Sequence, residues 1–122
     1  MIKIYDGNIF VLNSDKITYA LFVNKAGFLQ NLYFGEKVDS AFLYSIAEKY
    51  EAKTPNADDL NLDMYFDEMP SEYAFFARGD YNEPSVIARR KDGAEMSRLR
   101  YVGYEVKKGL PALKGMPCVR GE

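Results

Sequence analysis

Two apolar stretches separated by a short turn decide the fold: residues 17–23 read ITYALFV and residues 28–34 read FLQNLYF. Both are rich in β-branched and aromatic residues, which fit the half-buried surface of a strand. The residues between them, NKAG at 24–27, end in Gly27. A hairpin loop can take a positive φ at such a glycine. The sequence therefore predicts an antiparallel hairpin.

Shorter strands precede this hairpin. Residues 2–5 alternate isoleucine with lysine and tyrosine, and the DGN triplet at 6–8 supplies turn chemistry. Residues 9–12 read IFVL, and the NSD triplet at 13–15 turns the chain again. The first 35 residues therefore predict a meander of β-strands that Gly35 closes.

The hydrophobic period changes at residues 38–50. Apolar side chains recur there at a spacing of four, with two more beside them: Val38, Phe42, Ile46 and Tyr50, then Leu43 and Ala47. This spacing draws one apolar face on a helix, so residues 38–50 predict one short helix. The face serves either as packing surface within the domain or as a contact surface for another domain or subunit.

A polar segment follows at residues 51–68, with TPN at 54–56 as a helix breaker. Its acidic residues are Glu51, Asp58, Asp59, Asp63, Asp67 and Glu68. A calcium loop of the EF-hand type needs alternating oxygen ligands, a central glycine and a final glutamate, and no stretch here has that pattern. The segment predicts a long, solvated acidic loop, and we expect no metal site.

The strand pattern returns after Pro84, a residue that precedes or edges strands. Residues 86–89 read VIAR and run into RKDG at 90–93, where the Asp-Gly pair is typical of a hairpin turn. Residues 99–106 read LRYVGYEV and alternate apolar side chains on one face. A second hairpin is therefore expected over 86–106.

Composition excludes several classes of function. At 122 residues the chain is large enough for one domain, 1–122, and too short for two. The 16 Lys and Arg against 18 Asp and Glu leave no basic excess for nucleic-acid binding. No apolar run approaches the roughly 20 residues that span a bilayer, and no secretory signal is visible. We expect no nucleic-acid partner and no membrane partner.

The sequence has few of the residues that nucleophilic catalysis uses. Cys118 is the single cysteine and permits no internal disulfide, which fits a reducing cytoplasm. The chain has 0 histidines, so Ser–His and Cys–His pairs and histidine zinc sites are excluded. The cytoplasm is the expected location.

Aromatic side chains stack on sugar rings, and the chain has 10 Tyr and 8 Phe. The densest cluster gives the candidate carbohydrate-proximal residues Tyr73, Phe75, Phe76 and Tyr81. Aromatic residues in strands also serve as core residues that bury a large apolar area. Core or interdomain packing is the alternative interpretation of the same cluster.

Charged groups near this cluster have simpler interpretations than catalysis. Glycoside hydrolysis needs two carboxylates that flank the bond, and Glu72, Asp80 and Glu83 are close in sequence. A carboxylate beside glycine more often forms a turn, so no catalytic residue is expected here. The basic run Arg89-Arg90-Lys91, with Arg98 and Arg100, flanks the predicted turn and favours a solvated face.

The second half carries an ordered series of turn and strand markers: Met69-Pro70-Ser71-Glu72-Tyr73, Gly79-Asp80-Tyr81-Asn82-Glu83-Pro84, Asp92-Gly93, Leu99-Arg100-Tyr101, Gly109-Leu110-Pro111-Ala112-Leu113 and Gly115-Met116-Pro117. In order and interval this series resembles the amino-terminal β-sandwich domain of bacterial α-galactosidases of glycoside hydrolase family 36.

The resemblance implies an all-β fold: part of a large antiparallel β-sandwich (a supersandwich) with one short helix and a long acidic loop. It makes the chain an N-terminal fragment of a larger glycosidase, with the catalytic barrel and its two aspartates absent from residues 1–122. The implied function is that of a non-catalytic domain of an α-galactosidase, which hydrolyses terminal α-galactosides with retention. The domain would serve barrel packing and oligomer assembly.

The implied partners are the catalytic barrel of the same protein, further copies in a homo-oligomer, and galactosides; no cofactor is implied. A sandwich half of this kind leaves uncovered apolar surface, so we expect self-association. The alternative function is a stand-alone carbohydrate-binding or interaction module that uses Tyr73, Phe75, Phe76 and Tyr81.

Overall fold

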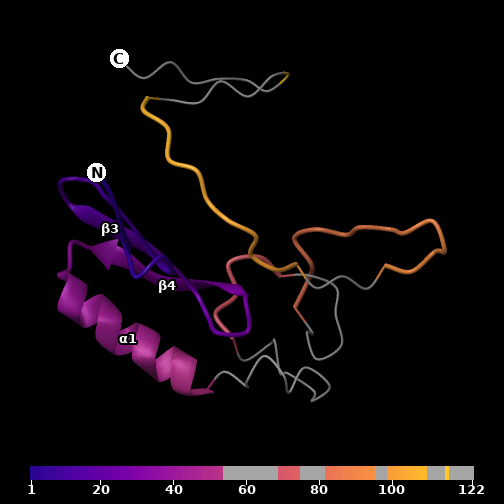
Figure 1. Cartoon of the computed structure of the whole chain (residues 1–122), viewed down its shortest axis with the longest axis horizontal. Helices are drawn as coiled ribbons and strands as arrows, with labels where there is room; N and C mark the ends of the chain where they lie inside the picture. Colours follow the sequence, from indigo (N-terminus) through magenta and orange to yellow (C-terminus); the bar gives the residue numbers. More distant parts are fainter. Residues whose placement is uncertain (54–68, 75–81, 96–98, 110–114, 116–122) are drawn as a thin grey trace.

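The computed structural model describes residues 1–53, 69–74, 82–95, 99–109 and 115 (Figure 1). Several predicted features lie outside these residues. Residues 54–68, which are most of the predicted acidic loop, are among them. So are three of the four carbohydrate-proximal candidates: Phe75, Phe76 and Tyr81. Asp80 of the candidate carboxylates, Arg98 of the basic residues and the single cysteine, Cys118, also lie outside the described residues.

A four-stranded antiparallel sheet forms the first third of the chain, with neighbouring strands in sequence order. Its strands are β1 (Ile2–Tyr5), β2 (Ile9–Asn13), β3 (Ile17–Val23) and β4 (Leu29–Glu36). The turn after β1 has positive φ at both Asp6 and Gly7, and the turn before β4 has φ 82° at Gly27. The predicted meander and its turn residues are confirmed, and β4 runs one residue past Gly35.

The pairing of β3 with β4 contains a β-bulge. Ala20 is opposite Tyr33, whereas Leu21 is opposite Asn31, so Leu32 is the extra residue on β4. Leu32 is nonetheless 4% exposed and belongs to the core cluster. A bulge of this kind bends and twists the strand locally and leaves one residue without an opposite partner.

The helix α1 (Ser40–Lys53) packs on one face of the sheet. Asp39 caps its start, because the Phe42 amide donates to Asp39 Oδ1 over 2.9 Å. Buried Thr18 of β3 fixes the residues that lead into α1 to the sheet. Its hydroxyl donates to Asn13 Oδ1 over 2.6 Å and accepts from the Val38 amide over 3.3 Å. The predicted helix is confirmed, shifted toward the C-terminus.

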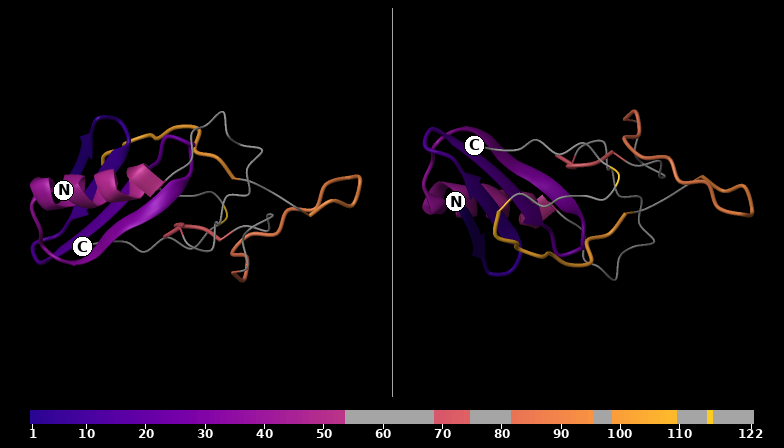
Figure 2. Two further views of the ribbon diagram at one scale, coloured as in Figure 1. Left: turned by 90° about the horizontal axis from the view of Figure 1, so that it is seen from below. Right: turned by 90° about the horizontal axis from the view of Figure 1, so that it is seen from above.

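The core lies between α1 and the sheet. Its buried members are Ile9, Val11, Ala20, Phe22, Leu32, Leu43 and Ala47. In the two views of Figure 2 the helix is in front of the strands on one side and behind them on the other. One face of the sheet is therefore covered by α1, and the other face is not.

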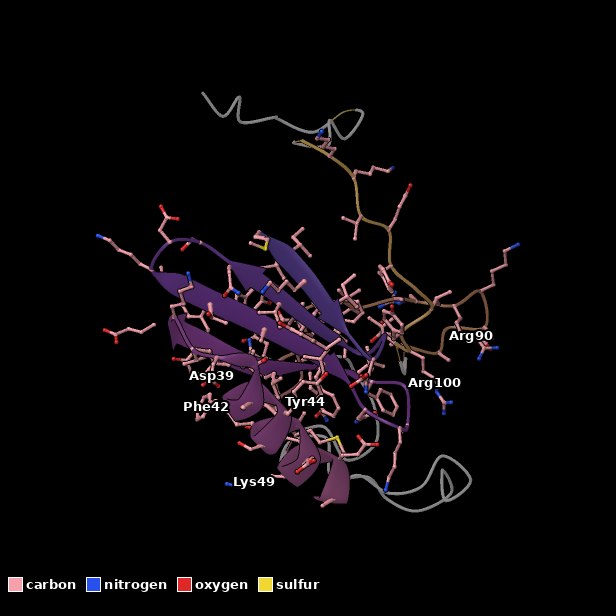
Figure 3. All side chains as sticks on the ribbon, turned by 60° about the vertical axis from the view of Figure 1, so that its left-hand side comes forward. Asp39, Phe42, Tyr44, Lys49, Arg90 and Arg100 are labelled. Atoms are coloured by element: carbon pink, nitrogen blue, oxygen red, sulfur yellow. The ribbon has the colours of Figure 1, made fainter. Side chains whose placement is uncertain are left out.

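The phase of the helix differs from the simplest expectation. Leu43 and Ala47 are buried, whereas Phe42 is 44% exposed and meets the ring of Tyr33 on β4 edge-on. In Figure 3 Phe42 lies on the outer side of α1 and Tyr44 lies toward the strands. The stripe through Phe42 is thus one flank of the apolar face, because the centre of contact with the sheet follows Leu43 and Ala47.

The second predicted hairpin is only partly confirmed. Its turn is present: the Arg90 amide donates to the Ala94 carbonyl over 2.8 Å, and Gly93 has φ 85°. The predicted strands at 86–89 and 99–106 are wrong for the described residues, where Val86 alone takes part in a bridge. A strand needs a partner for its backbone groups, and here Val102 is 98% exposed.

The described architecture is mostly antiparallel sheet with one helix, as the sequence predicts for an all-β, sandwich-type domain. A sandwich packs a second layer on the face that the first leaves free. That uncovered face carries the features described next.

Candidate functional site: the open face of the sheet

An apolar row crosses the sheet on the face opposite α1, which we call the open face. Ile2 pairs with Leu12, Leu12 with Tyr19, and Tyr19 with Phe34, so the four side chains lie side by side. Ile2 is 51% exposed, Leu12 38% and Phe34 70%. Exposed apolar side chains that form a contiguous patch mark interaction surfaces.

A second row on the same face is partly covered. Ile4, Phe10 and Leu21 are paired across β1, β2 and β3. The segment 99–106 crosses over this row, on the side away from α1 (Figure 2). The rings of Tyr101 and Tyr104 contact Phe10 with centroid distances of 5.9 and 5.1 Å. Between this segment and the sheet is an apolar cavity of about 230 Å³.

Residues 69–74 extend the sheet beyond β4. The Asn31 amide donates to the Pro70 carbonyl over 2.7 Å, and the Glu72 amide donates to the Leu29 carbonyl over 3.2 Å. Gln30 and Ser71 form an antiparallel bridge between these two bonds. The segment therefore docks along the outer edge of β4 and forms hydrogen bonds with some of the backbone N–H and C=O groups of that strand.

The side chain of Glu72 fixes this docked segment to the open face. The Tyr19 hydroxyl donates to Glu72 Oε1, and Asn31 Nδ2 donates to Glu72 Oε2 over 3.2 Å. Both carboxylate oxygens accept hydrogen bonds from the sheet, so Glu72 acts as an anchor. Glu83, the other described member of the candidate carboxylate set, is exposed.

Burial raises the pKa of Tyr19 above its ordinary value, and the hydrogen bond to Glu72 and its negative charge raise it further. The protonated phenol is the form that donates to the carboxylate. Its contribution to stability is therefore fully present below the unfolded pKa and is lost as the pH rises through the higher folded pKa.

We predict that the free energy of unfolding falls as the pH rises above 10.0, the ordinary tyrosine value. Tyr19→Phe should lower stability by about 1 kcal/mol at neutral pH, because a donor to a charged acceptor is lost. It should also flatten the alkaline decline. Urea unfolding between pH 7 and pH 11 measures both effects. A decline in Tyr19→Phe as steep as in the unaltered chain would contradict this role.

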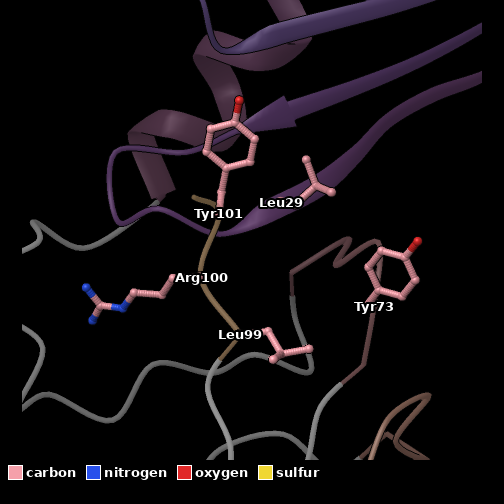
Figure 4. Close-up of a pocket in the computed structure, with 5 residues that line it drawn as sticks. All are labelled: Leu29, Tyr73, Leu99, Arg100 and Tyr101. Carbon is pink, nitrogen blue, oxygen red and sulfur yellow. The ribbon is translucent and has the colours of Figure 1, made fainter. Parts of the chain in front are cut away.

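Tyr73, next along the chain, lines a pocket of about 130 Å³ together with Leu29, Leu99, Arg100 and Tyr101 (Figure 4). Tyr73 is 54% exposed. In Figure 4 the Arg100 guanidinium extends away from Leu29 and Tyr73, and it lies 5.6 Å from the Phe28 ring centroid. The pocket thus has aromatic and aliphatic walls, with the charged group outside.

A comparison with protein families identifies the family of this chain. The family described as "Glycosyl hydrolase family 36 N-terminal domain" matches residues 27–122. The chain belongs to this family. The match contains β4, α1, the docked segment 69–74 and the segment 99–106, whereas β1, β2 and β3 precede it.

Named relatives of this family 36 domain are α-galactosidases. The chain is 32% identical to the bifunctional α-galactosidase/sucrose kinase AgaSK of Mediterraneibacter gnavus, over 98% of its own length and 13% of that protein. It is 32% identical to α-galactosidase 1 of Pediococcus pentosaceus, over 90% of its own length and 15% of that protein. The chain therefore spans about a seventh of these relatives.

A solved structure has the same fold. The galactosidase domain of the α-galactosidase–sucrose kinase AgaSK superposes with a TM-score of 0.79 at 30% identity, covering 98% of this chain and 17% of that one. The predicted family is confirmed, and so is the all-β, sandwich-type fold.

Of the basic residues that the sequence points to, Arg100 lines the pocket, whereas Arg89 and Arg90 do not. Arg89 pairs with Glu95, and Arg90 pairs with Asp92 over 3.2 Å, all beside the 90–94 turn. Arg90 and Arg100 lie far from α1 in Figure 3. Within the described ranges, no group of three or more acidic, cysteine or histidine side chains could hold a metal ion. No helix in those ranges is long and apolar enough to cross a membrane.

Sequence reasoning missed most of the open-face site. Of the four carbohydrate-proximal candidates, Tyr73 alone lies in the described residues, and it does line a pocket. Tyr19, Asn31 and Tyr101 were not selected. The signal that could have found Tyr19 and Asn31 is their position on the strand faces opposite buried Ala20 and Leu32.

Proposed function

We propose that this family 36 domain is the non-catalytic N-terminal domain of an α-galactosidase that hydrolyses terminal α-galactosides with retention of configuration. Residues 1–122 act as one domain. The work of the domain is to supply packing surface to the catalytic barrel of the same protein and to further copies in an oligomer.

The apolar row on the open face carries this proposal. Ile2, Leu12, Tyr19 and Phe34 form a continuous strip across four strands, and three of them are more than a third exposed. A contiguous exposed apolar strip of this kind is typical of a surface that packs against another domain or another copy. The names of the relatives and the matched family support the parent activity.

The site chemistry supports a non-catalytic role. A retaining glycosidase needs two carboxyl groups about 5–5.5 Å apart, one as nucleophile and one as acid/base. Glu72 has both oxygens in hydrogen bonds that hold residues 69–74 to the sheet. These two hydrogen bonds account for Glu72 as a structural anchor of the docked segment.

We therefore expect the purified chain to show no turnover of p-nitrophenyl α-D-galactopyranoside above the buffer rate. The α-galactosidase 1 of Pediococcus pentosaceus serves as the positive control. Turnover that disappears in the variant Glu72→Gln, with the fold retained by circular dichroism, would contradict the non-catalytic role.

The alternative is a carbohydrate-binding module, and one observation favours it. Tyr73 lies at the pocket with Tyr101, while Phe75, Phe76 and Tyr81 are outside the described residues. Sugar binding at this pocket is compatible with a packing role elsewhere on the open face.

A further inference from the structure

The outer edge of β4 is paired along only part of its length. β4 is the last strand of the sheet, so only one of its sides faces another strand. On the other side, residues 69–74 pair with Leu29 and Asn31. Beyond the bulge, the stretch Phe34–Glu36 has no strand beside it among the described residues.

The hydrogen bonds on either side of this stretch show which backbone groups point outward. The Lys37 amide donates back to the Lys16 carbonyl over 2.9 Å, so Lys37 faces β3. Backbone groups alternate between the two sides of an antiparallel strand. Gly35 therefore faces β3 as well, opposite Thr18, whereas Phe34 and Glu36 direct their N–H and C=O groups away from the sheet.

These outward groups are open to a partner. Within the described part of the chain, the amide and carbonyl of Phe34 and the amide of Glu36 form no further hydrogen bond. The Glu36 carbonyl accepts from the Tyr33 hydroxyl over 3.0 Å, and a carbonyl oxygen has a second lone pair. A row of unpaired N–H and C=O groups at a sheet edge is a template for another strand.

We propose that Phe34–Glu36 pairs with the same stretch of a second copy of this chain, antiparallel about a two-fold axis at Gly35. In this register Phe34 exchanges both backbone hydrogen bonds with Glu36 of the second copy, and the symmetry repeats the pair. The sheets of the two chains become one continuous sheet. The inference rests on the oligomer role proposed above and names the contact that builds the oligomer.

The length of the open stretch favours a second copy as the partner strand. Residues 69–74 bound it on one side, and the turn into α1 bounds it on the other. A partner strand must therefore be equally short, and β4 of a second copy is bounded in the same way. A register centred on Phe34 would bring Glu36 of the second copy beside Leu32, close to the pairing of residues 69–74, so the axis at Gly35 fits better.

This pairing also continues the apolar row of the open face. Phe34 is the last member of the row and is 70% exposed. In the proposed register it is diagonal to Phe34 of the second copy, at about 7–8 Å, which two aromatic rings can bridge. Gly35 meets Gly35 of the second copy at a Cα–Cα distance of about 4.5 Å, a close approach that no side chain obstructs. Two rows thus become one longer apolar strip.

Amide hydrogen exchange followed by NMR tests the pairing on the 122-residue chain. The background is Leu12→Glu, which weakens association through the apolar row and leaves β4 unaltered. Because the open stretch is short, we expect a dissociation constant of about 0.1 mM. At a chain concentration of about 1 mM, roughly four chains in five are then paired. The Phe34 and Glu36 amides should therefore exchange about fivefold more slowly than at high dilution.

The substitution Glu36→Pro tests the edge itself. Proline removes an N–H that points away from β3, so the bonds between β3 and β4 are kept. The dissociation constant should rise about thirtyfold, because each dimer loses two backbone hydrogen bonds. Glu36→Ala is the matched control. It keeps the amide and removes a charge that is close to its counterpart in the dimer, so it should pair at least as tightly. Sedimentation velocity measures both variants.

Two outcomes would overturn the proposal. The first is exchange of the Phe34 and Glu36 amides that is independent of concentration, either fast at an edge that stays open or slow at an edge covered within one chain. The second is a Glu36→Pro chain, folded by circular dichroism, that pairs as tightly as Glu36→Ala. If Glu36→Pro does not fold, the exchange experiment still decides. Neither outcome bears on the apolar row, which substitutions on the open face test separately.

Discussion

Replacing Leu43 with alanine is expected to lower the free energy of unfolding by about 2–5 kcal/mol. Leu43 is 2% exposed and is the deepest side chain that α1 contributes to the core. Its truncation leaves a cavity between the helix and the sheet, where it packs with Ala20 and Leu32.

The matched control is Phe42→Ala, one position earlier on the same helix. Phe42 is 44% exposed and meets the Tyr33 ring edge-on at 5.7 Å. Its removal should cost no more than about 1.5 kcal/mol, the upper range for one aromatic pair. Urea unfolding followed by far-UV circular dichroism measures both variants. If the two variants lost equal amounts of unfolding free energy, the face of α1 that packs on the sheet would not be centred on Leu43.

The second large effect concerns the open face. We expect the chain to self-associate through the apolar row, because Leu12 and Phe34 would otherwise remain in water. The double variant Leu12→Glu with Phe34→Glu should raise the dimer dissociation constant by about a hundredfold. Burying each carboxylate costs more than the roughly 1.4 kcal/mol that equals a factor of ten.

Sedimentation velocity over a range of concentrations measures this association. The control is Phe42→Glu, which places the same charge on the helix side of the molecule at a partly exposed aromatic position. It should leave the dissociation constant unchanged. An unaltered chain that stays monomeric at high concentration would contradict the proposed role of the open face as packing surface.

Local chemistry made the first part of the fold predictable. Alternating apolar residues and short turns are self-contained signals, and Gly7 and Gly27 take the positive φ values that their turns require. The helix was predictable from its period alone. Its phase was not, because which flank of an apolar stripe becomes buried depends on the sheet it meets, and that is a long-range contact.

The open-face site was harder to predict for the same reason. Tyr73 and Tyr101 are brought together through Leu29, and Tyr19 meets Glu72 across 53 positions of sequence. No local pattern encodes such a meeting. The prediction of a strand over residues 99–106 was wrong for a related reason. These residues have the alternation of a strand, but a strand forms only beside a partner, and the described residues contain no partner for this segment.

The bulge in β4 determines where this domain tolerates changes in length. Without Leu32 the residues on either side of it would pair in plain alternation, which is the arrangement that already places Asn31 on the open face and Tyr33 on the helix face, so no later side chain would change face. Phe34 would stay on the open face, and the loss would be one buried core side chain, Leu32. A one-residue insertion or deletion elsewhere in β4 would reverse the faces of the side chains that follow, so changes in length should accumulate in the turns and at this bulge.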